Sequence, residues 1–399
     1  MTHAARRQIR PSRRLAALEG YAFDEVNKRV AALRAQGIEP IDFGVGDPTV
    51  PTPQLVRDRL KTAVDERATS GYPSYQGDPG YRAACAAWME RRFGTALDPD
   101  REVCATIGSK EAVFHAPEGF LDPGDLILVP SPGYPPYKRG ALFAEAEPWF
   151  YPLRREHGYL PDLDAIPDDV ADRARAIWVC YPNSPTGAVA DRAFYERLVE
   201  KADRHDWVIF SDEAYSEIYF GDEPPTSLLQ VQREGSLVFF SMSKRSAMTG
   251  WRIGWVAGDE DLVAQFRKVK TNVDSGTPTF IQDAAVAALE DETHVVEFRA
   301  AYREKRDILL AAFAACGLED CTPAASLYIW QKVPEGLSGV DFAGRLLEPD
   351  IAAVCTPGEW ISDVVADGSN PGAGYVRFAL VPTLEDTRRA ADRIATLTW

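Results

Sequence analysis

The chain has 399 residues, of which 45% are hydrophobic and 26% are charged. This composition is typical of a globular protein, and the length exceeds the roughly 250–300 residues over which one hydrophobic core usually keeps growing. The formal net charge of −16 argues against nucleic acid or an anionic membrane surface as a general partner. We therefore expect a large domain and a smaller one, with an acidic surface that still permits a small anion in a local basic pocket.

Cysteine and histidine usage gives no sign of a disulfide framework or a metal centre. The six cysteines include no CxxC pair, and several lie in apolar runs, so we expect buried thiols in a reducing, cytoplasmic compartment. Cys316 and Cys321 are near in the sequence, but a disulfide between them is not favoured. The five histidines lack metal-ligand spacing, and no apolar run approaches the ~20 residues needed to span a bilayer.

The N-terminus is basic. It carries five arginines before its first acidic residue, Glu19, and these are Arg6, Arg7, Arg10, Arg13 and Arg14. Because no apolar signal core follows them, a secretory signal is not expected. An arm that packs on a partner subunit is the preferred interpretation, and an organelle transit peptide is the alternative.

The first part of the chain predicts helices joined by Gly- and Pro-rich loops. Tyr21 to Gln36 reads as a helix because apolar residues recur at spacings of three and four, and Gly37 ends it. The strand-like segment IDFGV follows and runs into Gly46. Residues 55–64 and 81–93 are amphipathic helix candidates, separated by the loop GYPSYQGDPG.

Short apolar strands then alternate with helical segments. The predicted strands are residues 103–107, 126–129, 177–180, 208–210, 237–240 and 255–257. Continuous apolar runs of this length suit a parallel sheet buried on both faces, and the alternation predicts a doubly wound, mostly parallel α/β sheet. Polar or Gly/Pro-rich residues follow each strand at once, so these strand ends should form one crevice.

The C-terminal part has a different pattern. A long helix at residues 295–316 precedes predicted strands at 327–331, 352–355 and 375–379, with helices at 341–347 and 383–397. We predict a smaller α+β domain built from both chain ends. The expected division is an N-terminal arm and helix at 1–40, a large cofactor-binding domain at 41–293, and a small domain at 294–399.

Lys244 is the first candidate functional residue. It follows the predicted strand 237–240 and a hydroxyl-rich turn containing Ser241 and Ser243, and Arg252 comes eight residues later. Desolvation favours the neutral amine, which can attack a carbonyl to form a Schiff base. Taken alone, this lysine could equally lie on the surface in a Ser-rich loop.

A phosphate seat is indicated beside it. Gly108 and Ser109 join a strand to a helix start, where free N–H groups and the helix dipole suit a phosphate. Ser241, Ser243 and Arg252 could complete the seat. Lys110 is either a further contact or a solvated first-turn residue, and the second interpretation is favoured.

Other strand ends carry an aromatic ring, amides and an acid. Tyr134 lies in a Pro-stiffened loop and could form a flat wall for a planar ligand, or simply pack. Asn183 and Ser184 offer polar side chains after strand 177–180. Asp212 ends a buried strand, which is costly for an acid unless it is paired, and Tyr215 follows it. A protonated heteroaromatic nitrogen would be such a partner, so this set of groups predicts pyridoxal phosphate.

The ordered motifs resemble a class I aminotransferase of the fold-type-I pyridoxal-phosphate superfamily. They are GVGDPTVPTP, GYPSYQGDPGYR, YPNSPTG, SDEAY, SMSKRSAMTGWRIGW and YVRFAL, and they span nearly the whole chain. The segments SKRSAMTGWRIGW and VKTNVDSGTPTFIQ are similar to those of aminotransferases acting on diaminopimelate or its N-succinyl form.

The resemblance implies a transaminase that binds pyridoxal 5′-phosphate. Lys244 would be the Schiff-base lysine and proton shuttle, with Asp212 on the pyridine nitrogen and Tyr215 on the ring 3-hydroxyl. Tyr134 would stack on the ring, and Arg377 would clamp the substrate α-carboxylate near Gly46. The phosphate contacts would be Gly108, Ser109, Ser241, Ser243 and Arg252, with Tyr72 entering from the other subunit of a homodimer with shared active sites.

Several points stay open at this stage. The family usually has asparagine immediately before Pro-Thr-Gly, but that place is Ser184 here, so either Asn183 or Ser184 could contact the 3-hydroxyl. Arg245 and Lys270 are candidates for a distal carboxylate, although salt bridges or solvent are favoured for both. An aspartate- or alanine-type aminotransferase, a β-lyase on the same fold, and a non-catalytic regulatory module are the alternative functions.

Overall fold

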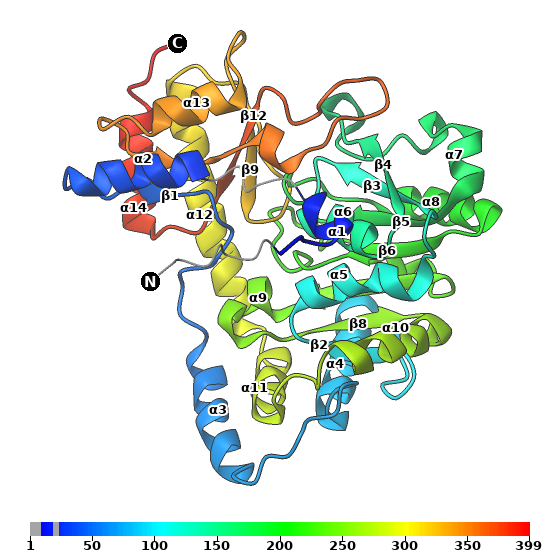
Figure 1. The fold of residues 1–399 in the computed structure, drawn as a ribbon. Helices are drawn as coiled ribbons and strands as arrows, with labels where there is room; N and C mark the ends of the chain where they lie inside the picture. Colours follow the sequence, from blue (N-terminus) through cyan, green and yellow to red (C-terminus); the bar gives the residue numbers. More distant parts are fainter. Residues whose placement is uncertain (1–8, 19–23) are drawn as a thin grey trace, which may run out of the picture.

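The computed structural model describes residues 9–18 and 24–399. Its largest element is a seven-stranded sheet of order β2-β8-β7-β6-β5-β3-β4 (Figure 1). The bounds are β2 Val103–Thr106, β3 Leu126–Ser131, β4 Glu147–Pro152, β5 Ala174–Cys180, β6 Val208–Asp212, β7 Ser236–Ser241 and β8 Gly254–Gly258. Strand β8 runs antiparallel to both β2 and β7, and the other neighbouring pairs are parallel. The mostly parallel sheet predicted from the sequence is confirmed.

Each predicted strand of this sheet is present, and one further strand was missed. Strand β4 has the sequence EPWFYP, in which Pro148 and Pro152 remove two backbone donors. Prolines are tolerated at a sheet edge, where one side of the strand needs no ladder partner. Strand β4 pairs only with β3 and is such an edge strand. It was not predicted because its two prolines are typical of a loop.

Helices cover both faces of the sheet, as expected of a doubly wound fold. The bounds are α3 Gln54–Glu66, α4 Pro79–Phe93, α5 Ser109–Phe120, α6 Pro135–Phe143, α7 Asp168–Arg173, α8 Arg192–His205, α9 Met242–Arg245, α10 Glu260–Val273 and α11 Thr279–Glu290. Buried side chains of α3, α4, α8 and α11 share one core with the sheet. Those of α5, α6 and α10 form a second core on its other face. Short 3₁₀ turns are η1 Arg155–His157, η2 Leu163–Ala165, η3 Leu228–Gln230 and η4 Thr249–Trp251.

The C-terminal elements form a separate cluster together with helix α2 and strand β1 from the N-terminal part of the chain. The bounds are α2 Asp24–Ala35, β1 Ile41–Asp42, α12 Thr293–Ala315, β9 Tyr328–Lys332, α13 Gly339–Leu346, β10 Ala353–Val354, β11 Thr356–Pro357, η5 Gly358–Ile361, β12 Tyr375–Ala379 and α14 Leu384–Ile394. Strands β11, β12 and β9 make an antiparallel sheet, and β1 pairs with β10. The α+β unit built from both chain ends is confirmed, and Figure 1 shows it at the upper left.

The N-terminal segment is described in part. A short helix, α1 (Arg13–Ala16), lies near the end of α6, where the Arg14 guanidinium donates to the carbonyl oxygen of Phe143 at 3.1 Å and pairs with Glu145 at 3.5 Å. Arg6, Arg7 and the predicted helix start at 21–23 lie outside the described residues. Within the described ranges, no helix combines the length and apolar character that crossing a membrane requires.

All six cysteines lie in the described part of the chain and are free. Cys316 and Cys321 therefore form no disulfide, as expected, and Cys321 is half-buried while the other five are buried. Over the described residues, no group of three or more His, Cys, Asp or Glu side chains is arranged to hold a metal ion.

Candidate active site

The candidate residues converge because three neighbouring parallel strands end at the same edge. The β5–β6 register pairs Cys180 with Asp212, and the β6–β7 register pairs Asp212 with Phe239. Asn183 follows β5, Asp212 closes β6, and Lys244 lies in α9 directly after β7. Ligands of open α/β sheets bind outside the carboxyl ends of such strands.

Gly108 and Arg252 form the centre of the predicted phosphate seat. Gly108 precedes α5 with φ +73°, and a Cβ at this position would lie 2.5 Å from Nη2 of Arg252. The Arg252 guanidinium donates to the carbonyl oxygens of Thr249 at 2.7 Å and Ile107 at 3.3 Å. It is thus fixed beside the free N–H groups of the first turn of α5, which begins at Ser109. A guanidinium next to a helix N-terminus suits an anion.

The two predicted serines lie at the adjoining turn. Ser241 precedes α9, and its hydroxyl accepts a hydrogen bond from the backbone N–H of Ser243 at 3.2 Å. Both serines are buried. The exposed side chain of Lys110 agrees with the favoured interpretation of a solvated first-turn residue.

Asp212 is buried and has no charged partner among the described residues. Its side chain is 4% exposed. The Tyr137 hydroxyl donates to Oδ2 at 2.8 Å, and the Ala214 N–H donates to Oδ1 at 3.2 Å. Burial raises the pKa of Asp212 to about 6, although both hydrogen bonds oppose the increase. A cationic ring nitrogen at this carboxylate would favour its ionised form.

Lys244 is directed at the backbone of the predicted substrate-binding segment. Its Nζ donates to the carbonyl oxygen of Gly46. Burial lowers the pKa of the Lys244 amine, and the nearby Arg377 guanidinium lowers it further, while the Tyr328 phenol opposes the change. A larger share of neutral amine follows, as a nucleophilic lysine requires.

Arg377 projects from β12 toward the same place. Its Nη2 donates to the carbonyl oxygen of Gly44 at 2.8 Å and to the Thr356 hydroxyl at 3.4 Å, and its guanidinium carbon lies 4.5 Å from the centroid of the Tyr328 ring. Its Nε is buried and has no hydrogen-bond partner within the described chain. A buried donor left unpaired is unfavourable, so a carboxylate bound here would satisfy it.

The loop after β5 distinguishes Asn183 from Ser184. The Asn183 amide nitrogen donates to the carbonyl oxygen of Cys180 at 3.1 Å, and its oxygen accepts from the N–H and hydroxyl of Thr186 at 3.1 and 2.8 Å. These bonds hold the loop in shape. Ser184 is also buried, but within the described residues its hydroxyl makes none of the side-chain bonds of this loop.

The structure places the remaining predicted side chains as follows. The half-buried Tyr134 ring packs edge-on against Tyr137, with centroids 5.7 Å apart. Tyr72 is 94% exposed, which fits a residue that acts in another subunit. Arg245 pairs with Glu292 at 2.7 Å.

Lys270, the other distal-carboxylate candidate, is buried between Glu111 at 3.2 Å and Asp274 at 2.7 Å. The favoured interpretation of Arg245 and Lys270 as salt-bridge residues is confirmed.

Two residues of this region were not identified from the sequence. Tyr137 lies three residues after Tyr134, so helical spacing at the start of α6 could have indicated it. Tyr328 opens β9 and gives no local signal. It reaches the site because β9 pairs with β12, which carries Arg377.

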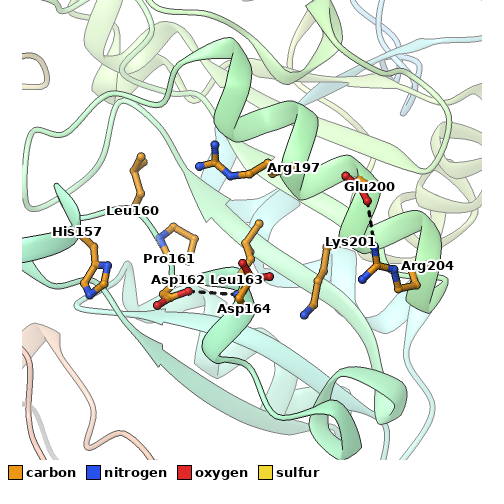
Figure 2. A pocket seen from close by; sticks show the side chains of 10 residues that line it. All are labelled: His157, Leu160, Pro161, Asp162, Leu163, Asp164, Arg197, Glu200, Lys201 and Arg204. Carbon is orange, nitrogen blue, oxygen red and sulfur yellow. Dashed lines mark hydrogen bonds and ion pairs between the residues drawn. The ribbon is translucent and has the colours of Figure 1, made fainter.

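Figure 2 shows a different hollow, between the η1–η2 segment and α8. Its lining is mixed in charge and includes the pair Arg204–Glu200 at 3.0 Å. The Asp162 side chain caps the start of η2 by accepting hydrogen bonds from the backbone N–H groups of Asp164 and Ala165. None of its lining residues is a candidate from the sequence, so this hollow is distinct from the crevice at the strand ends.

Comparison with known proteins agrees with the motifs. The family described as aminotransferase class I and II matches residues 38–394. An LL-diaminopimelate aminotransferase from Aquifex aeolicus is 44% identical over 97% of this chain and 98% of its own length. One from Syntrophobacter fumaroxidans is 42% identical with the same coverage.

Solved structures with the same fold include several aminotransferases. A Thermus thermophilus aspartate aminotransferase double mutant has a TM-score of 0.88 at 29% identity, over 97% of this chain and 99% of that one. A probable N-succinyldiaminopimelate aminotransferase from Thermus thermophilus has a TM-score of 0.85 at 31% identity, over 94% and 99% of the two chains.

Proposed function

Because the chain belongs to the class I and II aminotransferase family, we propose that it is a pyridoxal-phosphate-dependent transaminase whose amino donor is LL-diaminopimelate. The amino acceptor is a 2-oxo acid such as 2-oxoglutarate. The observation that carries this proposal is that Lys244 and Asp212 lie at one sheet edge, with Arg377 of β12 close to Lys244, in a chain whose full-length relatives are named for that donor.

The residues at this edge fit pyridoxal phosphate. Asp212 is a buried carboxylate with two neutral donors and no charged partner among the described residues. Gly108 leaves a space beside Arg252 that any Cβ would fill. We assign the phosphate to Gly108, Ser109, Ser241, Ser243 and Arg252, and the pyridine nitrogen to Asp212. When bound, the cofactor supplies a carbonyl that takes up the amino group and a ring that accepts electrons from the substrate α-carbon.

The chain's own groups have separate tasks in this proposal. Lys244 supplies a desolvated amine that can hold and move a proton at Nζ. Arg377 orients the substrate by binding its α-carboxylate through paired N–H groups. Tyr134 would stack on the cofactor ring, and Tyr215 would donate to the oxygen of its 3-hydroxyl. Ser184 is the better candidate for a second contact at that oxygen, since Asn183 is bonded within its loop.

We also propose a homodimer with shared active sites. Tyr72, on the loop GYPSYQGDPG, is 94% exposed. Burying a large apolar side chain stabilises a protein by about 1.5–3 kcal/mol, so an exposed ring of this size favours burial in a subunit interface. We propose that the Tyr72 hydroxyl contacts the phosphate of the cofactor that the partner subunit holds. The remaining ligands are small molecules, namely the amino acid and the 2-oxo acid.

Turnover with a panel of donors tests the function. Reconstituted enzyme is given 2-oxoglutarate with LL-diaminopimelate, N-succinyl-LL-diaminopimelate, aspartate or alanine, and glutamate formation is measured. The proposal predicts the highest kcat/KM for LL-diaminopimelate. Faster turnover of aspartate or alanine would reassign the donor. A cysteine thioether such as cystathionine, which carries a leaving group on Cβ, tests the alternative: pyruvate and ammonia formed from it with release of the thiol, in the absence of an acceptor, would indicate a β-lyase.

A further inference from the structure

Tyr328 contacts three of the groups that the proposed function uses. Its side chain is 4% exposed, and its hydroxyl lies 3.2 Å from the Tyr215 hydroxyl. Its ring lies 4.5 Å from the Arg377 guanidinium. A Cβ on Gly46 would come within 2.0 Å of its oxygen. Tyr328 belongs to β9 of the C-terminal cluster, whereas Tyr215 follows β6 of the large sheet.

We infer that Tyr328 is a positioning residue. Its one side chain orients the Tyr215 hydroxyl and restrains the Arg377 guanidinium, and so links cofactor binding to recognition of the substrate carboxylate. The inference rests on the proposed function, because Tyr215 and Arg377 receive their roles there. Tyr328 itself acts through these two residues.

The hydroxyl of Tyr328 orients that of Tyr215. Burial and the neighbouring phenol raise the pKa of Tyr215, so Tyr215 keeps its proton at neutral pH. When Tyr328 donates to Tyr215, the Tyr215 proton is left to donate to an acceptor in the crevice. Such O–H chains strengthen one another in a medium of low dielectric constant.

The ring of Tyr328 restrains Arg377. A guanidinium over an aromatic face is held by cation–π attraction, and here the Gly44 carbonyl oxygen fixes the same group from another direction at 2.8 Å. The Tyr328 side chain fills the space that a Cβ on Gly46 would need, since such a Cβ would lie 2.0 Å from the Tyr328 hydroxyl. Gly46 also accepts the hydrogen bond of Lys244, so Tyr328 packs against the segment that locates the lysine.

Two substitutions separate these effects. Tyr328→Phe removes the hydroxyl and keeps the ring, so we expect the dissociation constant of pyridoxal phosphate to rise roughly 2- to 10-fold with little change in substrate KM. Tyr328→Leu removes both, so KM for the amino donor should also rise, by roughly 5- to 30-fold. Cofactor binding is measured by equilibrium dialysis, which does not depend on activity.

Controls distinguish positioning from general destabilisation. Tyr195→Phe removes an equally buried phenol hydroxyl in α8, outside the site, and should leave both constants unchanged. The double variant Tyr215→Phe/Tyr328→Phe should bind cofactor no more weakly than Tyr215→Phe alone, because the two hydroxyls act as one unit.

Wild-type cofactor affinity in Tyr328→Phe, or additive losses in the double variant, would overturn the inference and leave the proposed function standing. Wild-type protein that binds no pyridoxal phosphate would instead overturn the proposed function, and this inference with it.

Discussion

Replacing Asp212 by asparagine should stabilise the cofactor-free protein while it weakens cofactor binding. Asparagine has nearly the same shape as aspartic acid and carries no charge, so it mimics the protonated carboxyl group at every pH. Burial raises the pKa of Asp212 from 3.8 to about 6, and each pKa unit corresponds to about 1.36 kcal/mol. Ionised Asp212 therefore lowers the free energy of unfolding by about 3 kcal/mol.

The sign of this contribution determines its pH dependence. A folded-state pKa above the unfolded value gives stability that is complete below the unfolded pKa and is lost as the pH rises through the folded one. Wild type and Asp212→Asn should thus be about equally stable near pH 4, and the variant should be more stable from about pH 7 upward. For 399 residues, 3 kcal/mol corresponds to a Tm difference of about 4 °C.

Thermal unfolding of cofactor-free wild type and Asp212→Asn, recorded from about pH 4 to pH 8, measures this difference. Asp222→Asn, in an exposed loop, is the matched control and should follow the wild-type curve. A difference between wild type and Asp212→Asn that stays constant with pH would refute the assignment of Asp212 as a buried, uncompensated carboxylate.

Three further changes probe the other groups of the site. Lys244→Ala should retain pyridoxal phosphate but lose turnover by several orders of magnitude, and near-normal turnover would exclude Lys244 as the nucleophile. Gly108→Ala places a Cβ 2.5 Å from Nη2 of Arg252 at a φ of +73°, so dialysis should show cofactor affinity reduced about 10-fold or more; unchanged affinity would contradict the phosphate seat. Arg377→Lys keeps the charge but loses the paired donors, so KM for the amino donor should rise about 10- to 100-fold, and an equal fall in kcat alone would contradict a role in carboxylate binding.

The strand ends of the large sheet could be predicted because their chemistry is local. Apolar runs followed by polar residues mark β5, β6 and β7, and the sheet topology then brings Asp212 and Lys244 to one edge. Strand β4 could not be predicted in the same way, since the prolines of EPWFYP read as loop and only its edge position makes them tolerable.

Residues whose place in the site depends on tertiary packing could not be predicted from the sequence. Tyr328 follows no motif, and its place in the site results from the pairing of β9 with β12. The choice between Asn183 and Ser184 needed the hydrogen bonds of the folded loop, because both are small polar residues between prolines. Composition and spacing carry no information about either feature.

The most direct test of the central claim is the half-reaction with LL-diaminopimelate. Wild-type enzyme loaded with pyridoxal phosphate is mixed with the donor in the absence of any 2-oxo acid, and the visible absorption of the bound cofactor is followed. We predict that LL-diaminopimelate removes this absorption faster than N-succinyl-LL-diaminopimelate, aspartate or alanine, and that 2-oxoglutarate restores it. An absorption that LL-diaminopimelate leaves unchanged, while another of these amino acids removes it, would contradict the proposed function.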